Sequence, residues 1–178
     1  VVVERREHQH RRPTVGVLGL GEMGGTVATR LAAFGYTVQG WSRSQRQIDG
    51  VKTFAGSDGL AAFLAGTDVL VSMLPLTEST RGLINAQTLA QLPRGAFLVN
   101  AGRGGHLVDA DVLAALDSGQ LGGALLDVFH EEPLPKDHAY WSHPKVIVTP
   151  HIAATAPIKD ACAQIVAKIG AMERGELV

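Results

Sequence analysis

The chain has 178 residues, of which 46% are apolar and 19% charged, and its net charge is −1. This length allows one substantial domain with its own core, and the balanced charge argues against a nucleic-acid-binding surface. No apolar run approaches the roughly 18 residues that cross a membrane, and the apolar start is too short for a signal peptide. The single cysteine, Cys162, cannot form an internal disulfide. We therefore expect a soluble cytoplasmic protein that binds neither nucleic acid nor a membrane.

Short apolar runs alternate with helical patterns along the chain. Near-continuously apolar strands are typical of a sheet that is buried on both faces. The alternation predicts an α/β fold, a doubly wound parallel sheet of the Rossmann type with helices on both faces. Asp109 is expected to be a helix N-cap and Gly119 a C-terminal stop. The predicted strands cover residues 14–19, 36–41, 68–74, 95–101, 122–129 and 145–150, and the predicted helices cover 23–34, 59–64, 80–92, 109–118 and about 157–174.

A glycine-rich motif follows the first predicted strand. Gly19, Gly21 and Gly24 form G-x-G-x-x-G at the start of an amphipathic helix. The first glycine permits a tight turn, the second lets the backbone approach a pyrophosphate, and the third lets the helix pack close to the strand. The N-terminus of that helix can then face the phosphates. In this context the motif predicts dinucleotide binding rather than a plain structural turn.

The end of the second predicted strand indicates which dinucleotide is bound. NAD-type sites place Asp or Glu roughly 20 residues past the glycines. Here Ser42 and Arg43 stand in that place, and Arg46 follows. A hydroxyl can donate to a 2′-phosphate and a guanidinium can pair with it, whereas a carboxylate would repel it. We therefore predict NADP(H) as the preferred cofactor, with NAD(H) possible; the alternative is a solvated polar loop.

Three further loops carry polar residues just after predicted strands. Arg103 follows one strand, Asp127 and Glu132 lie at and after the next, and His151 follows the last. The carboxyl ends of parallel strands lie at one edge of the sheet, where open α/β sheets bind ligands. Arg103 can bind a carboxylate, His151 can donate a proton to a carbonyl oxygen, and Glu132 can orient the imidazole. These residue types suit hydride transfer between a nicotinamide and a 2-oxo acid.

Some assignments in this region stay open. Glu131 is a rival for the role of Glu132. The only long irregular stretch, 130–144, is often a sign of function in a compact domain. Within it, Trp141 and His143 border the substrate pocket on one interpretation and anchor the loop on the other.

The motifs GLGEMG, WSRS, LPLTEST, NAGRGG, LLDVFHEEPLP and VTPHIAA occur in that order. From about Thr14 to Val178 the chain resembles the NAD(P)-binding domain of the D-isomer-specific 2-hydroxyacid dehydrogenases, and within them the glyoxylate/hydroxypyruvate reductase A group. The resemblance implies NADPH-dependent reduction of small 2-oxo acids, with no metal and with Arg103, Glu132 and His151 as catalytic residues. It also implies that Asp127 holds the nicotinamide carboxamide. The implied cofactor-binding residues are Gly19, Gly21, Glu22, Met23, Gly24, Ser42, Arg43, Leu74, Pro75, Thr80, Ala101, Gly102 and Asp127.

The chain departs from this family in its length. The family has a separate substrate domain, built mainly from sequence ahead of the nucleotide domain, whereas only 13 residues precede the first predicted strand here. We expect a linker or remnant over 1–13, the nucleotide-binding domain over 14–156 and a C-terminal helix over 157–178, in a fragment of a homodimeric enzyme. Two other functions remain open: a 3-hydroxy-acid dehydrogenase of the 6-phosphogluconate type, and a non-catalytic NAD(P)-sensing scaffold.

Overall fold

The structure is a computed structural model that describes residues 12–154 and, near the C-terminus, 166, 169, 171, 172 and 174. The expected linker over 1–13 and the expected helix over 157–178 therefore lie largely outside the described residues.

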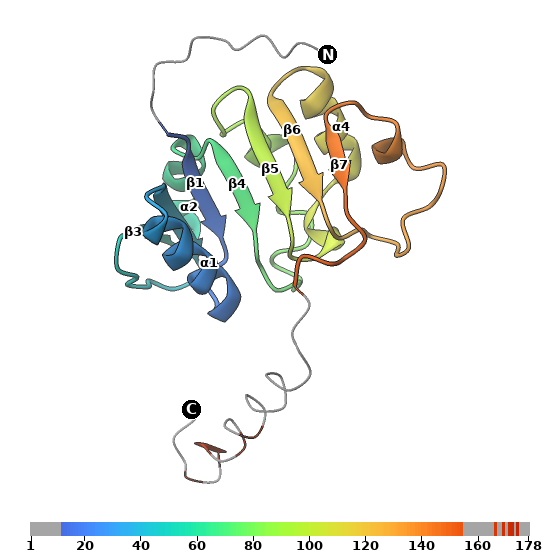
Figure 1. Cartoon of the computed structure of the whole chain (residues 1–178). Coiled ribbons are helices and arrows are strands. Elements are labelled where there is room, and N and C mark those ends of the chain that lie inside the picture. Colours follow the sequence, from blue (N-terminus) through green and yellow to red (C-terminus); the bar gives the residue numbers. More distant parts are fainter. Residues whose placement is uncertain (1–11, 155–165, 167–168, 170, 173, 175–178) are drawn as a thin grey trace.

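The described residues form a parallel sheet of seven strands (Figure 1). Its strand order is β3-β2-β1-β4-β5-β6-β7, and every neighbouring pair is parallel. The order reverses between β1 and β4, which is where open α/β sheets bind ligands. This confirms the predicted Rossmann-type fold. The strands are β1 (Thr14–Leu18), β2 (Thr37–Ser42), β3 (Val51–Ala55), β4 (Val69–Ser72), β5 (Ala96–Asn100), β6 (Leu121–Leu126) and β7 (Val146–Val148).

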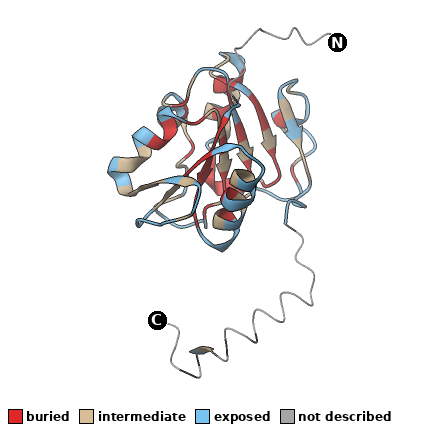
Figure 2. Cartoon of the chain, turned by 60° about the vertical axis from the view of Figure 1, so that its left-hand side comes forward, coloured by how far each residue is buried: buried red, intermediate tan, exposed pale blue. Residues whose placement is uncertain are grey.

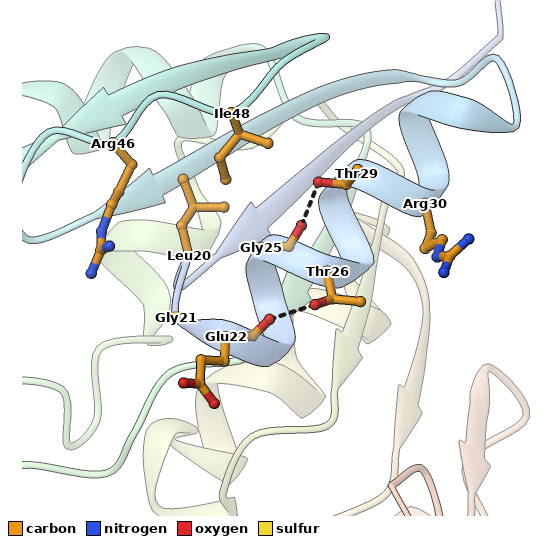
Figure 3. Close-up of a pocket in the computed structure, with 9 residues that line it drawn as sticks. All are labelled: Leu20, Gly21, Glu22, Gly25, Thr26, Thr29, Arg30, Arg46 and Ile48. Carbon is orange, nitrogen blue, oxygen red and sulfur yellow. Dashed lines mark hydrogen bonds between the residues drawn. The ribbon is translucent and has the colours of Figure 1, made fainter. Parts of the chain in front are cut away.

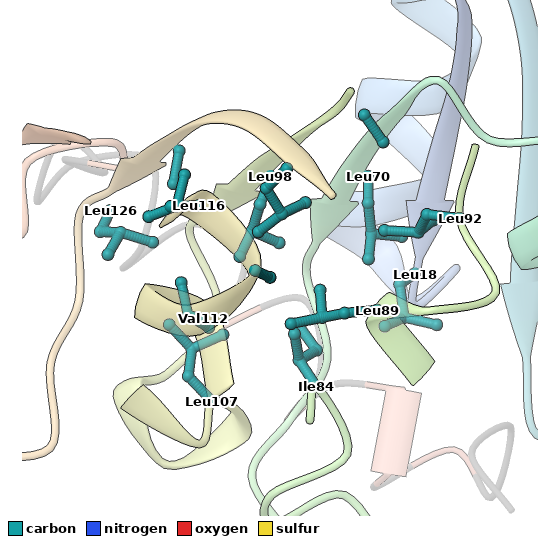
Figure 4. Packing of buried hydrophobic residues seen from close by; sticks show 14 of the residues in the cluster. Leu18, Leu70, Ile84, Leu89, Leu92, Leu98, Leu107, Val112, Leu116 and Leu126 are labelled. Atoms are coloured by element: carbon teal, nitrogen blue, oxygen red, sulfur yellow. The ribbon is translucent and has the colours of Figure 1, made fainter. Parts of the chain in front are cut away.

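Helices pack on the two faces of the sheet and enclose two separate apolar cores. On one face α1 contributes Ala28, which packs against Val17 and Val38 of the strands. On the other face α2, α3 and α4 enclose the larger core, part of which is shown in Figure 4. The described helices are α1 (Glu22–Ala33), α2 (Gly56–Ala65), α3 (Ala86–Leu89) and α4 (Asp109–Asp117), with short 3-10 turns η1 (Gly104–His106) and η2 (Ala139–Trp141).

The face that carries α1 is unevenly covered. In Figure 1 this face looks toward the viewer, and α1 lies near β1, β2 and β3. Phe97 on β5 is 47% exposed and Ile147 on β7 is 58% exposed. Figure 2 shows the strands as mostly buried or intermediate, while exposed residues gather on loops and on the outer sides of helices. The expectation that all strands are buried on both faces is therefore wrong for β5 and β7 within the described residues.

Two expected elements differ from the structure. The sequence pattern did not predict β3, because the polar residues Lys52 and Thr53 interrupt its apolar run. No residue of β3 is fully buried, since the strand lies at the edge of the sheet. The predicted helix over 80–92 is reduced to α3. Asn85 caps α3 by accepting hydrogen bonds from two backbone N–H groups, so the helix begins there and the residues before it form turns.

The ends of two helices also need correction. α2 begins at Gly56, ahead of the predicted 59. Val108, not Asp109, is the N-cap of α4. The Asp109 carboxylate instead accepts a hydrogen bond of 2.9 Å from the hydroxyl of Tyr140 in the long loop. Gly119 does follow α4 with a φ of 73°, as a helix stop requires.

Candidate cofactor and active site

The glycine turn between β1 and α1 has the geometry that a dinucleotide requires. Gly19 has a φ of 108° and donates its N–H to the carbonyl of Trp41 at 2.8 Å. A Cβ on Gly24 would lie 1.8 Å from the Gly19 oxygen, so only glycine fits there. A Cβ on Gly21 would meet nothing within 4 Å. The second glycine therefore borders open space, while the first and third are required by the turn itself.

The N-terminus of α1 is left without a side-chain cap. Gly21 is its N-cap, and no side chain there bonds to the first N–H groups of the helix. These amides and the positive end of the helix dipole are suited to an anion. Glu22 and Met23 are exposed in the same turn. The residues of the turn therefore fit the pyrophosphate of a dinucleotide.

A cavity of about 680 Å³ adjoins this turn along the outer side of α1 (Figure 3). The hydroxyls of Thr26 and Thr29 donate to the carbonyls of Glu22 and Gly25 within the helix. The wall on the other side includes Arg46. Arg46, which follows Arg43 in the sequence, is thus a second cation near the glycine turn. The cavity is lined by Leu20, Gly21, Glu22, Gly25, Thr26, Thr29, Arg30, Arg46 and Ile48.

Ser42 and Arg43 lie at the end of β2, as predicted. The Ser42 hydroxyl donates to the carbonyl of Ser44 at 2.7 Å. It would have to leave that bond to donate to a phosphate, so the structure does not show the free hydroxyl that we expected. Arg43 is exposed, and its guanidinium is the stronger candidate for a phosphate contact.

The segment after β4 lies against the glycine turn. A Cβ on Gly19 would approach the backbone of Met73 and Leu74 to 3.0 Å. Leu74 is buried and Pro75 is exposed. The Thr80 hydroxyl donates to the Pro75 carbonyl at 2.8 Å and thereby closes the loop. Thr80 thus shapes the segment that we expected to line the nicotinamide.

Arg103 projects from the loop after β5. The buried side chain of Asn100 holds this loop, because its Oδ1 accepts from the Gly102 N–H and its Nδ2 donates to the Arg103 carbonyl. Ala101 is fixed by its N–H, which donates to the carbonyl of Ser72 on β4. The Arg103 side chain is exposed, and its Nη1 donates to the Gly102 carbonyl at 2.7 Å.

The Arg103 loop packs against the loop that follows β6. A Cβ on Gly104 would lie 1.9 Å from the carbonyl carbon of Phe129. The charge of Arg103 is also close enough to contribute to lowering the pKa of Glu132. The structure therefore brings together the arginine and the carboxylate that the sequence placed on separate loops.

Glu132 and His151 form a hydrogen-bonded pair. The Glu132 Oε2 lies 2.7 Å from the His151 Nδ1, and Oε1 accepts from the Phe129 N–H at 2.9 Å. The bond with His151 is the main reason why the pKa of Glu132 is lowered, and the Phe129 N–H adds to the effect. Glu132, not its rival Glu131, is thus the carboxylate that can orient the imidazole.

Asp127 lies beneath the His151 loop. It is only 1% exposed, and its carboxylate accepts hydrogen bonds from the Thr149 hydroxyl and from the N–H groups of Ile152 and Ala153. Burial alone would raise the pKa of Asp127, but these bonds outweigh it and the net shift is downward. Asp127 therefore fixes the backbone of the His151 loop. Its implied bond to the nicotinamide carboxamide stays a prediction.

A smaller cavity of about 380 Å³ opens beside the Glu132–His151 pair. Trp141 lines this cavity, and its indole N–H also donates to the Pro135 carbonyl at 2.9 Å, so both interpretations of Trp141 stay open. His143 does not belong to its lining, and its Nε2 lies 3.3 Å from Asp117 of α4. The walls are mostly apolar and consist of Phe129, Glu132, Pro133, Leu134, Trp141, Val148, Pro150 and His151.

The described residues contain neither a candidate metal centre nor a candidate membrane-spanning helix. Their His, Cys, Asp and Glu side chains form no group of three or more that could hold a metal ion. In the same part of the chain, no helix has both the length and the hydropathy to cross a membrane.

The comparisons with known proteins agree with this geometry. Residues 3–153 match the family model described as D-isomer specific 2-hydroxyacid dehydrogenase, NAD binding domain. The chain belongs to this family. A curated relative, the glyoxylate/hydroxypyruvate reductase A of Yersinia enterocolitica, is 51% identical over 168 residues, which are 94% of this chain and 54% of the relative. The chain thus spans about half the length of the curated relatives it matches.

Two solved structures of the family are similar to the chain. One is an NADPH-dependent glyoxylate/hydroxypyruvate reductase from Sinorhizobium meliloti in complex with NADP and sulfate, with 45% identity and a TM-score of 0.85. The match covers 97% of this chain and 57% of that one. The other is a D-isomer specific 2-hydroxyacid dehydrogenase from Xanthobacter autotrophicus in complex with NADPH and MES, with 47% identity and a TM-score of 0.87, covering 98% and 74% of the two chains.

Proposed function

We propose that this chain is the nucleotide-binding part of an enzyme that reduces small 2-oxo acids, such as glyoxylate and hydroxypyruvate, with NADPH. The observation that carries the proposal is the 2.7 Å bond between Glu132 and His151, beside the loop of Arg103. These groups lie at the edge of the sheet that also carries the glycine turn. The printed names of the relatives from Yersinia enterocolitica and Sinorhizobium meliloti support the same reaction.

The cofactor supplies a hydride when it is bound, and the chain supplies the groups that hold it. The open space at Gly21 and the uncapped N-terminus of α1 receive the pyrophosphate. Arg43 pairs with a 2′-phosphate at the end of β2. The segment of Leu74 and Pro75 lines the nicotinamide, with Ala101 and Gly102 on the neighbouring loop. NAD(H) lacks the 2′-phosphate and is the weaker ligand.

Arg103 and His151 act on the substrate. A guanidinium has five N–H donors, and one of those of Arg103 bonds to Gly102, so the others can hold a carboxylate. His151 faces Glu132 with its Nδ1, which leaves Nε2 to donate a proton to the carbonyl oxygen. Glu132 stabilises the imidazolium in this orientation.

Three broader features belong to the same proposal. The complete enzyme contains a substrate domain, because the relatives are about twice as long as this chain. It forms a homodimer, as the resemblance to the family implies. A cytoplasmic location is supported by the single cysteine.

The test is a kinetic assay on the longest natural protein that contains this chain. We expect NADPH-dependent reduction of glyoxylate or hydroxypyruvate, with NADH less effective, and loss of turnover in His151→Gln. A protein that binds NADPH but reduces no acid from a panel of 2-oxo acids would instead support the non-catalytic sensing scaffold. Activity only on 3-hydroxy acids would support the 6-phosphogluconate type.

A further inference from the structure

His106 is a buried imidazole that the proposed reaction does not use. It lies on η1, three residues after Arg103, and is 0% exposed. Its Nδ1 accepts a hydrogen bond of 3.2 Å from the Arg103 N–H. The carbonyl of the same arginine accepts from Asn100. Two buried side chains therefore hold the backbone of Arg103 from both sides.

The hydrogen bond at Nδ1 identifies the tautomer of a neutral His106 ring. Because Nδ1 is an acceptor, a neutral ring carries its proton on Nε2. Within the described residues this buried Nε2 has no hydrogen-bond partner. The carbonyl of Pro75 is near enough to favour the charged ring, but desolvation by burial is the larger effect and lowers the pKa of His106. Burial thus favours the neutral ring, with its N–H on the side away from Arg103.

The ring also lies close to both loops of the site. A Cβ on Gly102 would meet His106 and the Leu74 carbonyl, each at 3.1 Å. The Pro75 carbonyl is also near the ring. His106 and Gly102 therefore connect the Arg103 loop with the segment of Leu74 and Pro75.

We propose that His106 is a positioning residue that sets Arg103 relative to the Leu74–Pro75 segment, and so sets the substrate carboxylate relative to the nicotinamide. The inference rests on the proposed function, because it takes Arg103 as the group that binds the carboxylate. His106 touches neither ligand and acts only through its neighbours. An aliphatic residue would fill the same space, but it would leave the Arg103 N–H without an acceptor.

The test compares His106→Leu with His106→Asn in the longest natural protein that contains this chain. Leucine removes the acceptor, whereas asparagine can place its Oδ1 where Nδ1 accepts the bond. We expect His106→Leu to raise the KM for the 2-oxo acid roughly three- to tenfold, the range expected from one lost hydrogen bond. The dissociation constant of NADPH should stay within about twofold. His106→Asn should restore most of the KM.

A second measurement does not depend on catalysis. The backbone amides of residues 101–106 should exchange hydrogen faster in His106→Leu than in the parent. In His106→Asn their exchange should return toward the parent rate. If the parent reduces no 2-oxo acid, the proposed function fails, while this exchange still decides whether His106 holds the Arg103 loop.

The proposal has clear contrary results. It is wrong if His106→Leu leaves both the KM and the exchange rate unchanged. It is also wrong if KM and NADPH affinity worsen together and asparagine restores neither, because that pattern means a purely structural residue. Should the leucine variant fail to fold, His106→Gln replaces it, since glutamine moves the acceptor away from the Nδ1 position. Equal KM values for the glutamine and asparagine variants would then contradict the role.

Discussion

The buried Asp127 fixes the backbone of the exposed His151. The Asp127 carbonyl accepts the His151 N–H at 2.8 Å, and its carboxylate holds the N–H groups of Ile152 and Ala153. His151 has a φ of 54°, which is uncommon and strained for a residue with a side chain. The buried aspartate therefore keeps an exposed histidine in a conformation that the free chain would avoid.

Asp127→Asn should damage both the stability and the activity of the protein. The side-chain amide of asparagine would place its own N–H donors opposite backbone N–H groups that now donate to the carboxylate. We expect a loss of about 1–3 kcal/mol in the free energy of unfolding, the cost of an unsatisfied buried group, measured by urea denaturation. The turnover of 2-oxo acids should fall as well. Asp117→Asn is the matched control, because the Asp117 side chain is 77% exposed; equal effects of the two changes would contradict the prediction.

Alanine at two glycines of the turn should separate folding from cofactor binding. Gly21→Ala adds a Cβ in open space with an ordinary φ of −69°. It should keep the melting temperature and weaken NADPH binding, because the added methyl group occupies the approach of the pyrophosphate. Gly24→Ala places a Cβ 1.8 Å from the Gly19 oxygen and should destabilise the fold.

The measurements for this pair are thermal unfolding and NADPH titration. Gly25→Ala is the control, since its Cβ would meet its nearest atom at 3.7 Å, and both properties should stay close to the parent. Unchanged NADPH affinity in Gly21→Ala would place the dinucleotide elsewhere.

Arg43 should determine the preference for NADPH. If its guanidinium pairs with the 2′-phosphate, Arg43→Ala should weaken NADPH binding about ten- to hundredfold and leave NADH binding nearly unchanged. Fluorescence titration with both cofactors gives the ratio. Arg94→Ala is the control, because it removes the same charge just ahead of β5, where Arg94 donates to the Ser118 carbonyl. If Arg43→Ala still prefers NADPH over NADH, Arg43 is not the main phosphate contact and Arg46 becomes the candidate.

The Glu132–His151 pair should control the rate of reduction. His151→Gln should lower turnover by about 10²- to 10⁴-fold, the usual contribution of a general acid, while NADPH binding is retained. Glu132→Gln should also lower turnover, because Nδ1 loses the carboxylate that stabilises its charge. Near-parent rates in a properly folded His151→Gln would rule out this role.

Stability should fall in acid for an identifiable reason. The folded-state pKa of Glu132 lies below its ordinary value of 4.5, mainly because His151 bonds to the carboxylate, and that of Asp127 lies below 3.8. A depressed carboxyl pKa adds stability that is present above the unfolded-state value and is lost as the pH falls through the folded-state value. Urea denaturation between pH 6 and 3 should therefore show a decline that is smaller in Glu132→Gln. An equal decline in both proteins would contradict the prediction.

Much of the site could be predicted from the sequence because parallel sheets obey simple rules. The apolar runs marked six strands, and the residues just after them had to meet at one edge. Arg103, Glu132 and His151 came together in this way. The glycine spacing was informative for a similar reason, since the tight contact at Gly24 depends only on the local turn.

The remaining features depend on contacts between distant segments. Nothing in the run GGHLV shows that His106 is buried against the loop of Leu74 and Pro75, because that packing forms only when β4 and β5 are paired. The internal bond of Ser42 to Ser44 follows from the course of the chain after β2. β3 was missed because an edge strand buries too little of its surface to show a clear apolar pattern.

The bond between Tyr140 and Asp109 sets the mobility of the loop that carries Glu132. The tyrosine is 1% exposed, and its hydroxyl ends 2.9 Å from the first residue of α4. Moving the loop away from α4 would break this hydrogen bond and expose the Tyr140 ring to water. Such a motion belongs with local unfolding, which takes microseconds or longer, and not with the nanosecond fluctuations of a free surface loop. We therefore expect Glu132 to stay beside His151 on the timescale of ligand encounter, so that the proposed proton donor is assembled before any substrate arrives.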